Sequence, residues 1–190
     1  MTVRQPEATE SAGLRRRLAL FFCDLAGTWR LLAEDGDLAT ASVLRAFFEH
    51  AERLGKAHHC EVIKFSGDGF LAALEEITEA LPLARAIQAL LTEVPALAGR
   101  SLGFRFSLHS ADVLCLDTTY GKDVFGDDVA VVAYLNDLAR RGQIVITQAA
   151  FERLPVDQQV LATRHEIVQV KGEDVPIHRL RLVPPQESEA

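Results

Sequence analysis

The sequence predicts a single α/β domain, in which amphipathic helices pack against a mostly antiparallel sheet. The chain has 190 residues, 48% hydrophobic and 25% charged, which is the length and composition of one ordinary globular domain. Apolar segments of strand length alternate along it with longer segments of helical periodicity. Turn-forming residues separate several neighbouring strands. A chain of this size buries enough surface to fold without disulfides.

The first half of the chain alternates strand and helix patterns. The hairpin is predicted from two apolar runs on either side of the short turn Ser66–Asp68. The helix before it is predicted from apolar residues at helical spacing, with Asp37 available as an N-cap. The predicted elements are a buried strand at Leu18–Cys23, a helix with apolar positions from Leu38 to Leu54, hairpin strands at Glu61–Phe65 and Gly69–Leu74, and a helix at Leu81–Leu91.

The second half continues the alternation and closes with two strands. Its predicted elements are a strand pair at Gly103–His109 and Ala111–Leu116, an apolar helix at Val129–Ala139, a strand at Gln143–Thr147, a short helical piece at Phe151–Leu154, and strands at Glu166–Val170 and Ile177–Val183 around the turn Lys171–Asp174. The polar segments Met1–Gly13 and Pro184–Ala190 are predicted to be flexible tails, which leaves a domain of residues 14–183.

Charge, apolar runs and cysteines exclude several classes of protein. With 20 Lys and Arg against 27 Asp and Glu, the net charge of -7 argues against a nucleic-acid binder. The longest apolar runs, Leu18–Cys23 and Val129–Leu135, are far too short to span a membrane, and no apolar secretory signal is visible. The three cysteines Cys23, Cys60 and Cys115 are odd in number and widely spaced, as expected of free thiols. We therefore expect a cytoplasmic protein without nucleic-acid or membrane partners.

Two acidic residues occupy positions that need a partner. Asp24 follows the first predicted strand and Asp68 lies in the hairpin turn. Each alone is explained as a cap or turn residue. If strand and hairpin are neighbours, both carboxylates reach one edge of the sheet, where they could hold two Mg²⁺ ions. Gly27 and Thr28 begin a candidate helix whose free N–H groups could bind phosphates. Together these features indicate nucleotidyl transfer by a two-metal mechanism.

Six segments in order resemble the class III nucleotidyl cyclase family, the catalytic domain of adenylate and guanylate cyclases. They are Phe22–Gly27, Val62–Gly69, Phe106–Val113, Asp123–Val129, Arg141–Thr147, and Val170–Gly172 with Pro176. The resemblance extends from about Leu18 to Leu182. It implies a ferredoxin-like α/β sandwich related to polymerase palms.

The resemblance also implies roles for individual residues. Asp24 and Asp68 correspond to the ligands of two Mg²⁺ or Mn²⁺ ions, assisted by the carbonyl of Leu25. Lys64 and Asp123 correspond to the pair that reads the purine, and a Lys with an Asp fits adenine. The lysine that holds the terminal phosphates in the family corresponds to Lys171.

Two positions on the helix Val129–Ala139 depart from the family pattern. The family usually has an Asn that orients the ribose and, four residues later, an Arg that stabilises charge on the α-phosphate. Here these positions hold Ala130 and Tyr134. Removing one preorganised donor to a developing charge typically costs about 10²–10³ in rate, so we expect little turnover. Arg140 and Arg141 follow the helix but lie about two turns away, so we do not expect them to replace the missing Arg.

Two functions remain open. In the family, two domains pair head to tail and each active site straddles the interface, so Lys64, Asp123 and Lys171 would face the aspartates of the opposite chain. The first function is attenuated conversion of ATP to 3′,5′-cyclic AMP and pyrophosphate by a homodimer. The second is a catalytically inactive domain that binds nucleotide or forms a heterodimer. A heterodimeric partner could also supply the missing Asn and Arg.

Overall fold

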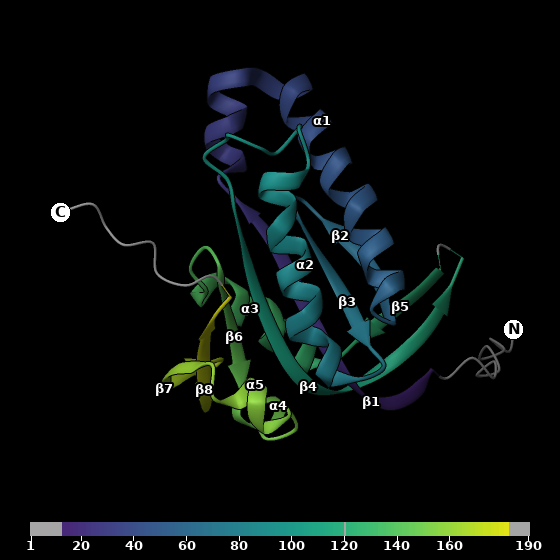
Figure 1. The fold of residues 1–190 in the computed structure, drawn as a ribbon. Helices are drawn as coiled ribbons and strands as arrows, with labels where there is room; N and C mark the ends of the chain where they lie inside the picture. Colours follow the sequence, from purple (N-terminus) through teal and green to yellow (C-terminus); the bar gives the residue numbers. More distant parts are fainter. Residues whose placement is uncertain (1–12, 120, 183–190) are drawn as a thin grey trace, which may run out of the picture.

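A computed structural model describes residues 13–119 and 121–182 as one mixed α/β sandwich (Figure 1). Its eight-stranded sheet has the order β2-β3-β1-β4-β6-β8-β7, and β5 pairs with β4. Helices α1 (Thr28–Ala57) and α2 (Ala80–Glu93) cover one face of the sheet. Helix α3 (Asp127–Leu138) packs on the opposite face.

The first half of the chain forms the ferredoxin-like part. Its strands are β1 (Leu14–Ala26), β2 (Cys60–Ser66), β3 (Gly69–Leu74) and β4 (Gly103–Thr118), with a short 3₁₀ helix η1 (Ile77–Glu79) before α2. These strands lie in the order β2-β3-β1-β4 and every pair is antiparallel. The arrangement confirms the predicted ferredoxin-like sandwich.

The second half extends the same sheet. It contains β5 (Gly121–Phe125), α3, β6 (Gln143–Thr147), α4 (Gln148–Phe151), α5 (Val156–Gln159), β7 (Ala162–Val170) and β8 (Glu173–Arg181). Strand β6 pairs with β4 in parallel, which is the one parallel pair among the described strands. The sheet is therefore mostly antiparallel, as the sequence predicts.

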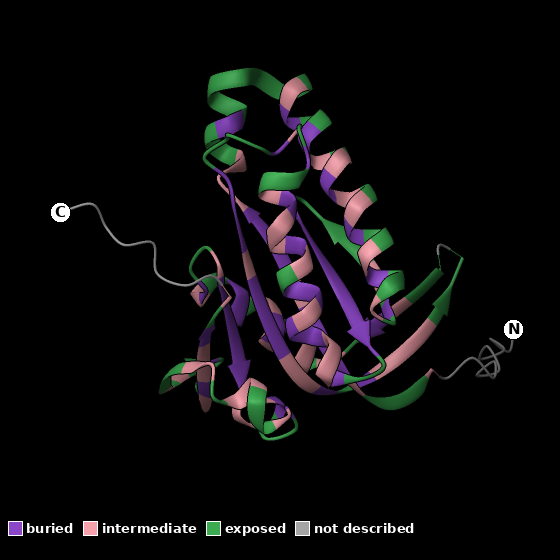
Figure 2. Cartoon of the chain, viewed as in Figure 1, coloured by how far each residue is buried: buried purple, intermediate pink, exposed green. Residues whose placement is uncertain are grey.

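Strand alternation divides the core into two layers. Phe21 points to the α1 and α2 side, whereas its neighbour Leu20 points to the α3 side. Figure 2 shows buried residues along the central strands and on the inner sides of α1 and α2. The rings of Phe21, Phe47, Phe70, Phe104 and Phe106 pack with centroids 4.9–6.3 Å apart. This aromatic layer fixes the strand ends that carry the candidate site.

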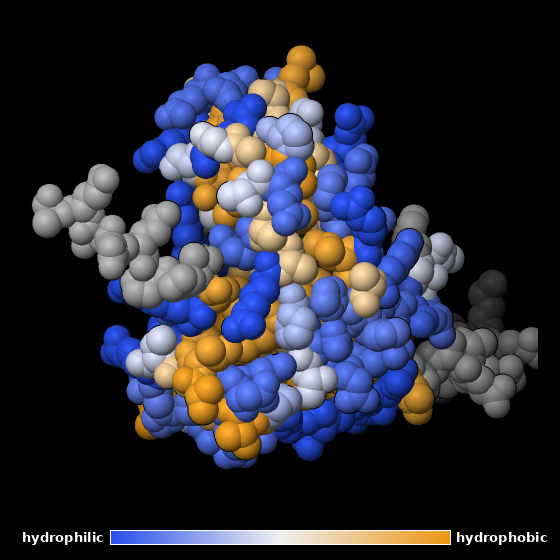
Figure 3. Space-filling view, in the orientation of Figure 1, coloured by the Kyte–Doolittle hydropathy of each residue, from blue (hydrophilic) through white to orange (hydrophobic). Residues whose placement is uncertain are grey.

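Hydrophobic side chains also reach the surface. In Figure 3 they gather around α5 at the lower end of the molecule, whereas the surface over α1 is mostly hydrophilic. Val156 and Val160 at the ends of α5 are exposed there. Within the described residues, no helix has the length and apolar character needed to cross a membrane.

Several element boundaries differ from the predictions. The predicted strand pair after Gly103 is the single strand β4, because Ser110 stays extended opposite Ala19 of β1. Helix α1 begins at Thr28, where the candidate phosphate-binding helix is predicted, and it continues through the stretch for which Asp37 is the predicted N-cap. Gly36, at φ 85° and ψ 177°, interrupts it before the predicted apolar stretch.

Other differences lie at the second half of the chain. The sequence pattern does not predict strand β5 or helix α5, because both are short and lack a clear apolar period. The last turn is only Lys171 and Gly172, because β8 already begins at Glu173. The predicted tails fall outside the described residues, apart from Gly13.

Candidate functional site

The two predicted metal ligands lie together where β1 ends and the β2–β3 turn closes. Asp24 of β1 pairs with Gly69, the residue directly after Asp68. The backbone N–H of Leu25 donates to the carbonyl oxygen of Asp68 at 3.0 Å. A Cβ on Gly69 would lie 2.7 Å from the carbonyl oxygen of Cys23, so glycine permits this close approach. The structure thus brings the two aspartates to one sheet edge, as the sequence predicts. We call this region the carboxylate edge: Asp24, Asp68, Thr28 and Arg105.

The carboxylate edge contains an acidic side chain, Asp24, that is buried away from water. Asp24 is only 8% exposed. Burial raises the pKa of Asp24 to about 6, a hydrogen bond from Arg105 opposes this, and the neighbouring Asp68 carboxylate adds to it. The guanidinium of Arg105 contacts one Asp24 oxygen through Nε, at 2.9 Å, and through Nη2. The hydroxyl of Thr28 donates to Asp68.

Arg105 is a residue that the sequence reasoning missed. It lies on β4 directly opposite Asp24, so its position is set by strand register. The sequence does contain a signal, because Arg105 is a cation between the apolar residues Phe104 and Phe106. A cation within a buried strand needs a carboxylate or a phosphate as partner.

The donor set of the carboxylate edge fits a hard divalent ion that is shared with a phosphate ligand. Carboxylate and carbonyl oxygens are the protein ligands that Mg²⁺ prefers. No cluster of three or more His, Cys, Asp or Glu side chains that could hold a metal occurs among the described residues. Mg²⁺ is typically held by one or two carboxylates, water and substrate phosphates, and the adjacent Asp24 and Asp68 match this pattern.

The start of α1 lies beside these carboxylates. Gly27 is its N-cap, with a left-handed φ of 107°, and no side chain caps the helix. The first N–H groups of a helix have no partner within it, so those after Gly27 are available to an anion. Trp29, in the first turn, is 81% exposed. Gly27 and Thr28 therefore lie at the helix N-terminus that the sequence predicts to bind phosphates.

The predicted purine pair is also assembled, at another part of the sheet. Lys64 of β2 donates to Asp123 of β5 at 2.6 Å, although the two residues are 59 positions apart. Burial opposes the change, but the hydrogen bond from Lys64 holds the pKa of Asp123 below its usual value. A second ion pair, Lys122 to Glu61 at 3.2 Å, links the same two strands. Asp123 borders a cavity of about 820 Å³ lined by residues of β1 to β5.

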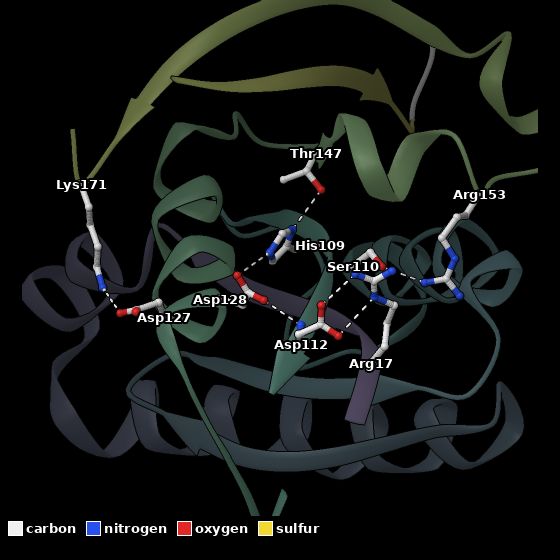
Figure 4. A network of polar contacts seen from close by, with 9 residues as sticks. All are labelled: Arg17, His109, Ser110, Asp112, Asp127, Asp128, Thr147, Arg153 and Lys171. Carbon is white, nitrogen blue, oxygen red and sulfur yellow. Dashed lines mark hydrogen bonds and ion pairs between the residues drawn. The ribbon is translucent and has the colours of Figure 1, made fainter. Parts of the chain in front are cut away.

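Lys171 lies in the turn between β7 and β8, and its side chain reaches the start of α3. Its Nζ is 3.1 Å from Asp127 Oδ1, in the first turn of α3 (Figure 4). Both side chains are exposed, so this surface ion pair costs little to break. The structure therefore places Lys171 beside α3 and free to engage another anion.

A network of polar contacts holds the N-terminal end of α3 against the sheet (Figure 4). Asp128 accepts a hydrogen bond from the backbone N–H of Asp112 at 2.7 Å. The Nε2 of His109 is 3.3 Å from Asp128, and its Nδ1 is 3.0 Å from the hydroxyl of Thr147. The network also includes the ion pair of Arg17 with Asp112. Helix α3 is thus fixed in register relative to β4 and β6.

The outer face of α3 carries the two residues that the sequence resemblance predicts to depart from the cyclase pattern. Ala130 and Tyr134 are both exposed, and Tyr134 is 42% exposed. Their spacing of four puts them on one helical face. The Asn of this helix, Asn136, is instead 2% exposed and faces the sheet. Its amide donates to the carbonyl oxygens of Phe22, at 3.3 Å, and Arg105, at 3.1 Å, so it ties α3 to the carboxylate edge.

Comparisons with known proteins identify the family and the fold. A family model described as "Adenylate and Guanylate cyclase catalytic domain" matches residues 12–181. A protein of Rhizobium meliloti (strain 1021), named "Putative adenylate cyclase 3", is 26% identical over 170 residues. That match covers 87% of this chain and 28% of the relative, so the chain spans just over a quarter of that protein's length.

Solved structures share the fold. The guanylyl cyclase Cya2 matches with a TM-score of 0.78 at 20% identity, over 89% of this chain and 93% of that one. An adenylate cyclase from Trypanosoma brucei matches with a TM-score of 0.76 at 20% identity, over 92% of each chain. The adenylyl cyclase CyaB of P. aeruginosa matches with a TM-score of 0.74 at 16% identity, over 93% and 98%.

Proposed function

The chain belongs to the adenylate and guanylate cyclase catalytic domain family, and from this we propose that it converts ATP to 3′,5′-cyclic AMP and pyrophosphate at an attenuated rate. The observation that carries the proposal is the carboxylate edge. Asp24 and Asp68, far apart in sequence, meet at the end of β1 beside an uncapped helix N-terminus. Two carboxylates and a phosphate cradle are the parts that a two-metal mechanism needs.

In this mechanism, Asp24, Asp68 and the carbonyl of Leu25 would hold two Mg²⁺ or Mn²⁺ ions. When bound, such ions lower the pKa of the ribose 3′-hydroxyl and neutralise the triphosphate. The 3′-hydroxyl would release its proton to water and its oxygen would bond to the α-phosphorus. The bond from that phosphorus to the oxygen that bridges to the β-phosphorus would break, and pyrophosphate would leave. The amides after Gly27 face the phosphates, and Thr28 keeps the Asp68 carboxylate oriented.

The nucleotide preference follows from the pair on β2 and β5. The ammonium of Lys64 would donate to a ring nitrogen of adenine, and Asp123 would accept from its 6-amino group. The two side chains already lie 2.6 Å apart, so a base that enters between them must replace one hydrogen bond with two. Lys171 would exchange Asp127 for the terminal phosphates, which is favourable because its present partner is exposed.

The proposed assembly is a head-to-tail homodimer. Each composite site then takes Asp24 and Asp68 from one protomer and Lys64, Asp123 and Lys171 from the other. Every protomer contributes one half to each of two sites. A heterodimer with another cyclase domain would follow the same geometry.

The exposed face of α3 supports a second candidate function. Ala130 has no polar side chain and Tyr134 carries no charge, so neither can orient a ribose or stabilise an α-phosphate as the usual Asn and Arg do. The alternative is therefore a catalytically inactive domain that binds nucleotide or pairs with a competent partner.

One assay separates the two functions. The purified protein is incubated with ATP and Mn²⁺, cyclic AMP is measured, and Asp68→Ala is run alongside. We expect slow production that disappears in the variant. Tight ATP binding without any product from the intact chain would contradict the enzyme and support the inactive domain.

A further inference from the structure

We infer that Arg141 binds the distal phosphates of a nucleoside triphosphate held at the carboxylate edge of its own protomer, an inference that rests on the proposed function. The Arg141 guanidinium would give the site a positive charge from the same chain that holds the metal ligands. The outer face of α3, which would face the partner's site, provides no such charge. Arg141 lies outside the residues assigned above to metal, base or phosphate binding.

The path of the Arg141 side chain carries the first step. The residue lies between α3 and β6, and the backbone N–H of Gly142 donates to the carbonyl of Phe104 at 2.8 Å, which fixes it beside the start of β4. The side chain runs directly over Gly103. A Cβ on Gly103 would lie 2.7–2.9 Å from the Cδ, Cγ and Cβ of Arg141, so only glycine leaves room for this path.

The end of the side chain reaches the phosphate cradle. Nη2 of Arg141 lies 2.9 Å from the position that a Cβ on Gly27 would take. Gly27 is the N-cap of α1, whose first amides have no partner within the helix. The guanidinium thus lies beside the residue at which the free helix amides begin, and both groups are donors that suit phosphate oxygens.

Strand register places Arg141 on the same side of the sheet as the metal ligands. Asp24 pairs with Arg105, and two residues further along Ala26 pairs with Gly103. Residues two apart on a strand point to the same face, so the space over Gly103 continues the row formed by Asp24 and Arg105. Arg141 fills that space. The row runs from the carboxylates towards the helix N-terminus, the direction in which a triphosphate tail would extend.

The charge on Arg141 is available to a ligand. Arg105, by contrast, is paired with Asp24 in this structure. In the part of the chain that the structure describes, Arg141 has no carboxylate within ion-pair distance, and its Nη1 reaches only the hydroxyl of Ser101, at 3.5 Å. An exposed arginine that lies beside a helix N-terminus and has no anionic partner is suited to binding phosphate in a bidentate manner.

The test compares Arg141→Met with Arg140→Met, a neighbouring exposed arginine, by isothermal titration of the full chain in Mn²⁺. The probes are inorganic tripolyphosphate, ATP and AMP. We expect Arg141→Met to weaken tripolyphosphate and ATP binding by about tenfold or more, as for loss of one charged hydrogen bond, and to leave AMP binding within about twofold. Arg141→Lys should recover part of the loss, and Arg140→Met should bind all three like the native chain.

A second variant guards against a merely structural effect. Gly103→Ala places a methyl group against the stem of Arg141 and should reproduce the loss for tripolyphosphate. Equal tripolyphosphate affinity in Arg141→Met and the native chain would overturn the inference, as would an equal loss for AMP. If the native chain binds tripolyphosphate through Arg141 but makes no cyclic AMP, the proposed catalysis fails while this inference stands. Native production of cyclic AMP, with ATP affinity unchanged in Arg141→Met, would overturn the inference alone.

Discussion

In the proposed site, the carboxylate edge and the outer face of α3 are two halves of the same chemistry, and they differ in how completely they are built. At the carboxylate edge, Asp24 has Arg105, Asp68 has Thr28, and Gly69 allows the turn to close on β1. On α3, Ala130 and Tyr134 stand exposed. In the proposed dimer the two halves meet only across the interface. One half can therefore be kept while the other is lost. On the proposed function, the chain would supply metal ligands, and its transition-state groups would come from elsewhere.

Restoring the second half is the most direct way to break the comparison. We expect the double change Ala130→Asn and Tyr134→Arg to raise cyclic AMP production by about 10²-fold or more, because each change returns a preorganised donor to developing charge. Initial rates with saturating ATP and Mn²⁺ measure this. Asp137→Asn, on an exposed position of the same helix, is the control and should leave the rate unchanged. A double variant no faster than the native chain would show that the defect lies elsewhere.

Mixing two chains tests whether the halves act across an interface. The triple variant Ala130→Asn, Tyr134→Arg, Asp68→Ala has a restored α3 but a broken carboxylate edge. Mixed in equal amounts with the native chain, it should give about a quarter of the rate of the restored homodimer, because half of the dimers then hold one complete site. Cyclic AMP is measured against mixing ratio, with the triple variant alone as the inactive control. A mixture no faster than the native chain alone would argue against composite sites.

The pKa values of Asp24 and Asp123 are shifted in opposite directions, which distinguishes the carboxylate edge from the predicted purine pair. Because the native pKa of Asp24, about 6, lies above that of an unfolded Asp, the native state holds its proton longer. The free energy of unfolding should therefore fall as pH rises from about 4 to 6, by roughly 2–3 kcal/mol from this group. Asp24→Asn removes that fall, whereas Asp123→Asn removes a contribution of opposite sign, since the pKa of Asp123 is lowered. Denaturant unfolding in chelator across this range measures both. Parallel pH profiles for native chain and Asp24→Asn would contradict the assignment.

The smallest effect concerns the link between the two halves. Asn136→Ala should lower the free energy of unfolding by about 1–2 kcal/mol, because it leaves the buried carbonyls of Phe22 and Arg105 without its amide. Thermal and denaturant unfolding measure the loss. Its exposed neighbour is the control: Asp137→Ala should change stability by less than about 0.5 kcal/mol. Equal stability of the two variants would show that α3 does not depend on this contact.

The sequence predicts the elements that rest on local patterns. The hairpin around Asp68 is correct because turn residues and two apolar runs determine it locally. The sheet edge that joins Asp24 to Asp68 follows from that hairpin and the neighbouring strand.

Features that depend on partners distant in sequence were not predictable. Arg105 faces Asp24 only through the β1–β4 register, and Asn136 looks like any polar residue on an apolar helix. The sequence pattern predicts two strands in place of β4, because Ser110 interrupts the apolar pattern. Pairing with β1 nevertheless keeps Ser110 extended. The sequence places Arg141 about two helical turns beyond the missing Arg, but α3 ends at Leu138 and the side chain of Arg141 lies over Gly103.

The exposure of Trp29 has a practical consequence. It is the single tryptophan among 190 residues, and it directly follows Thr28, whose hydroxyl holds Asp68. Its indole is bathed in solvent, so its emission starts near that of free indole in water and responds to any group that covers it. Trp29 is thus an intrinsic fluorescent probe beside the carboxylates. Binding of a metal, a nucleotide or a second protomer at this edge would change the wavelength and intensity of its emission in the unmodified chain.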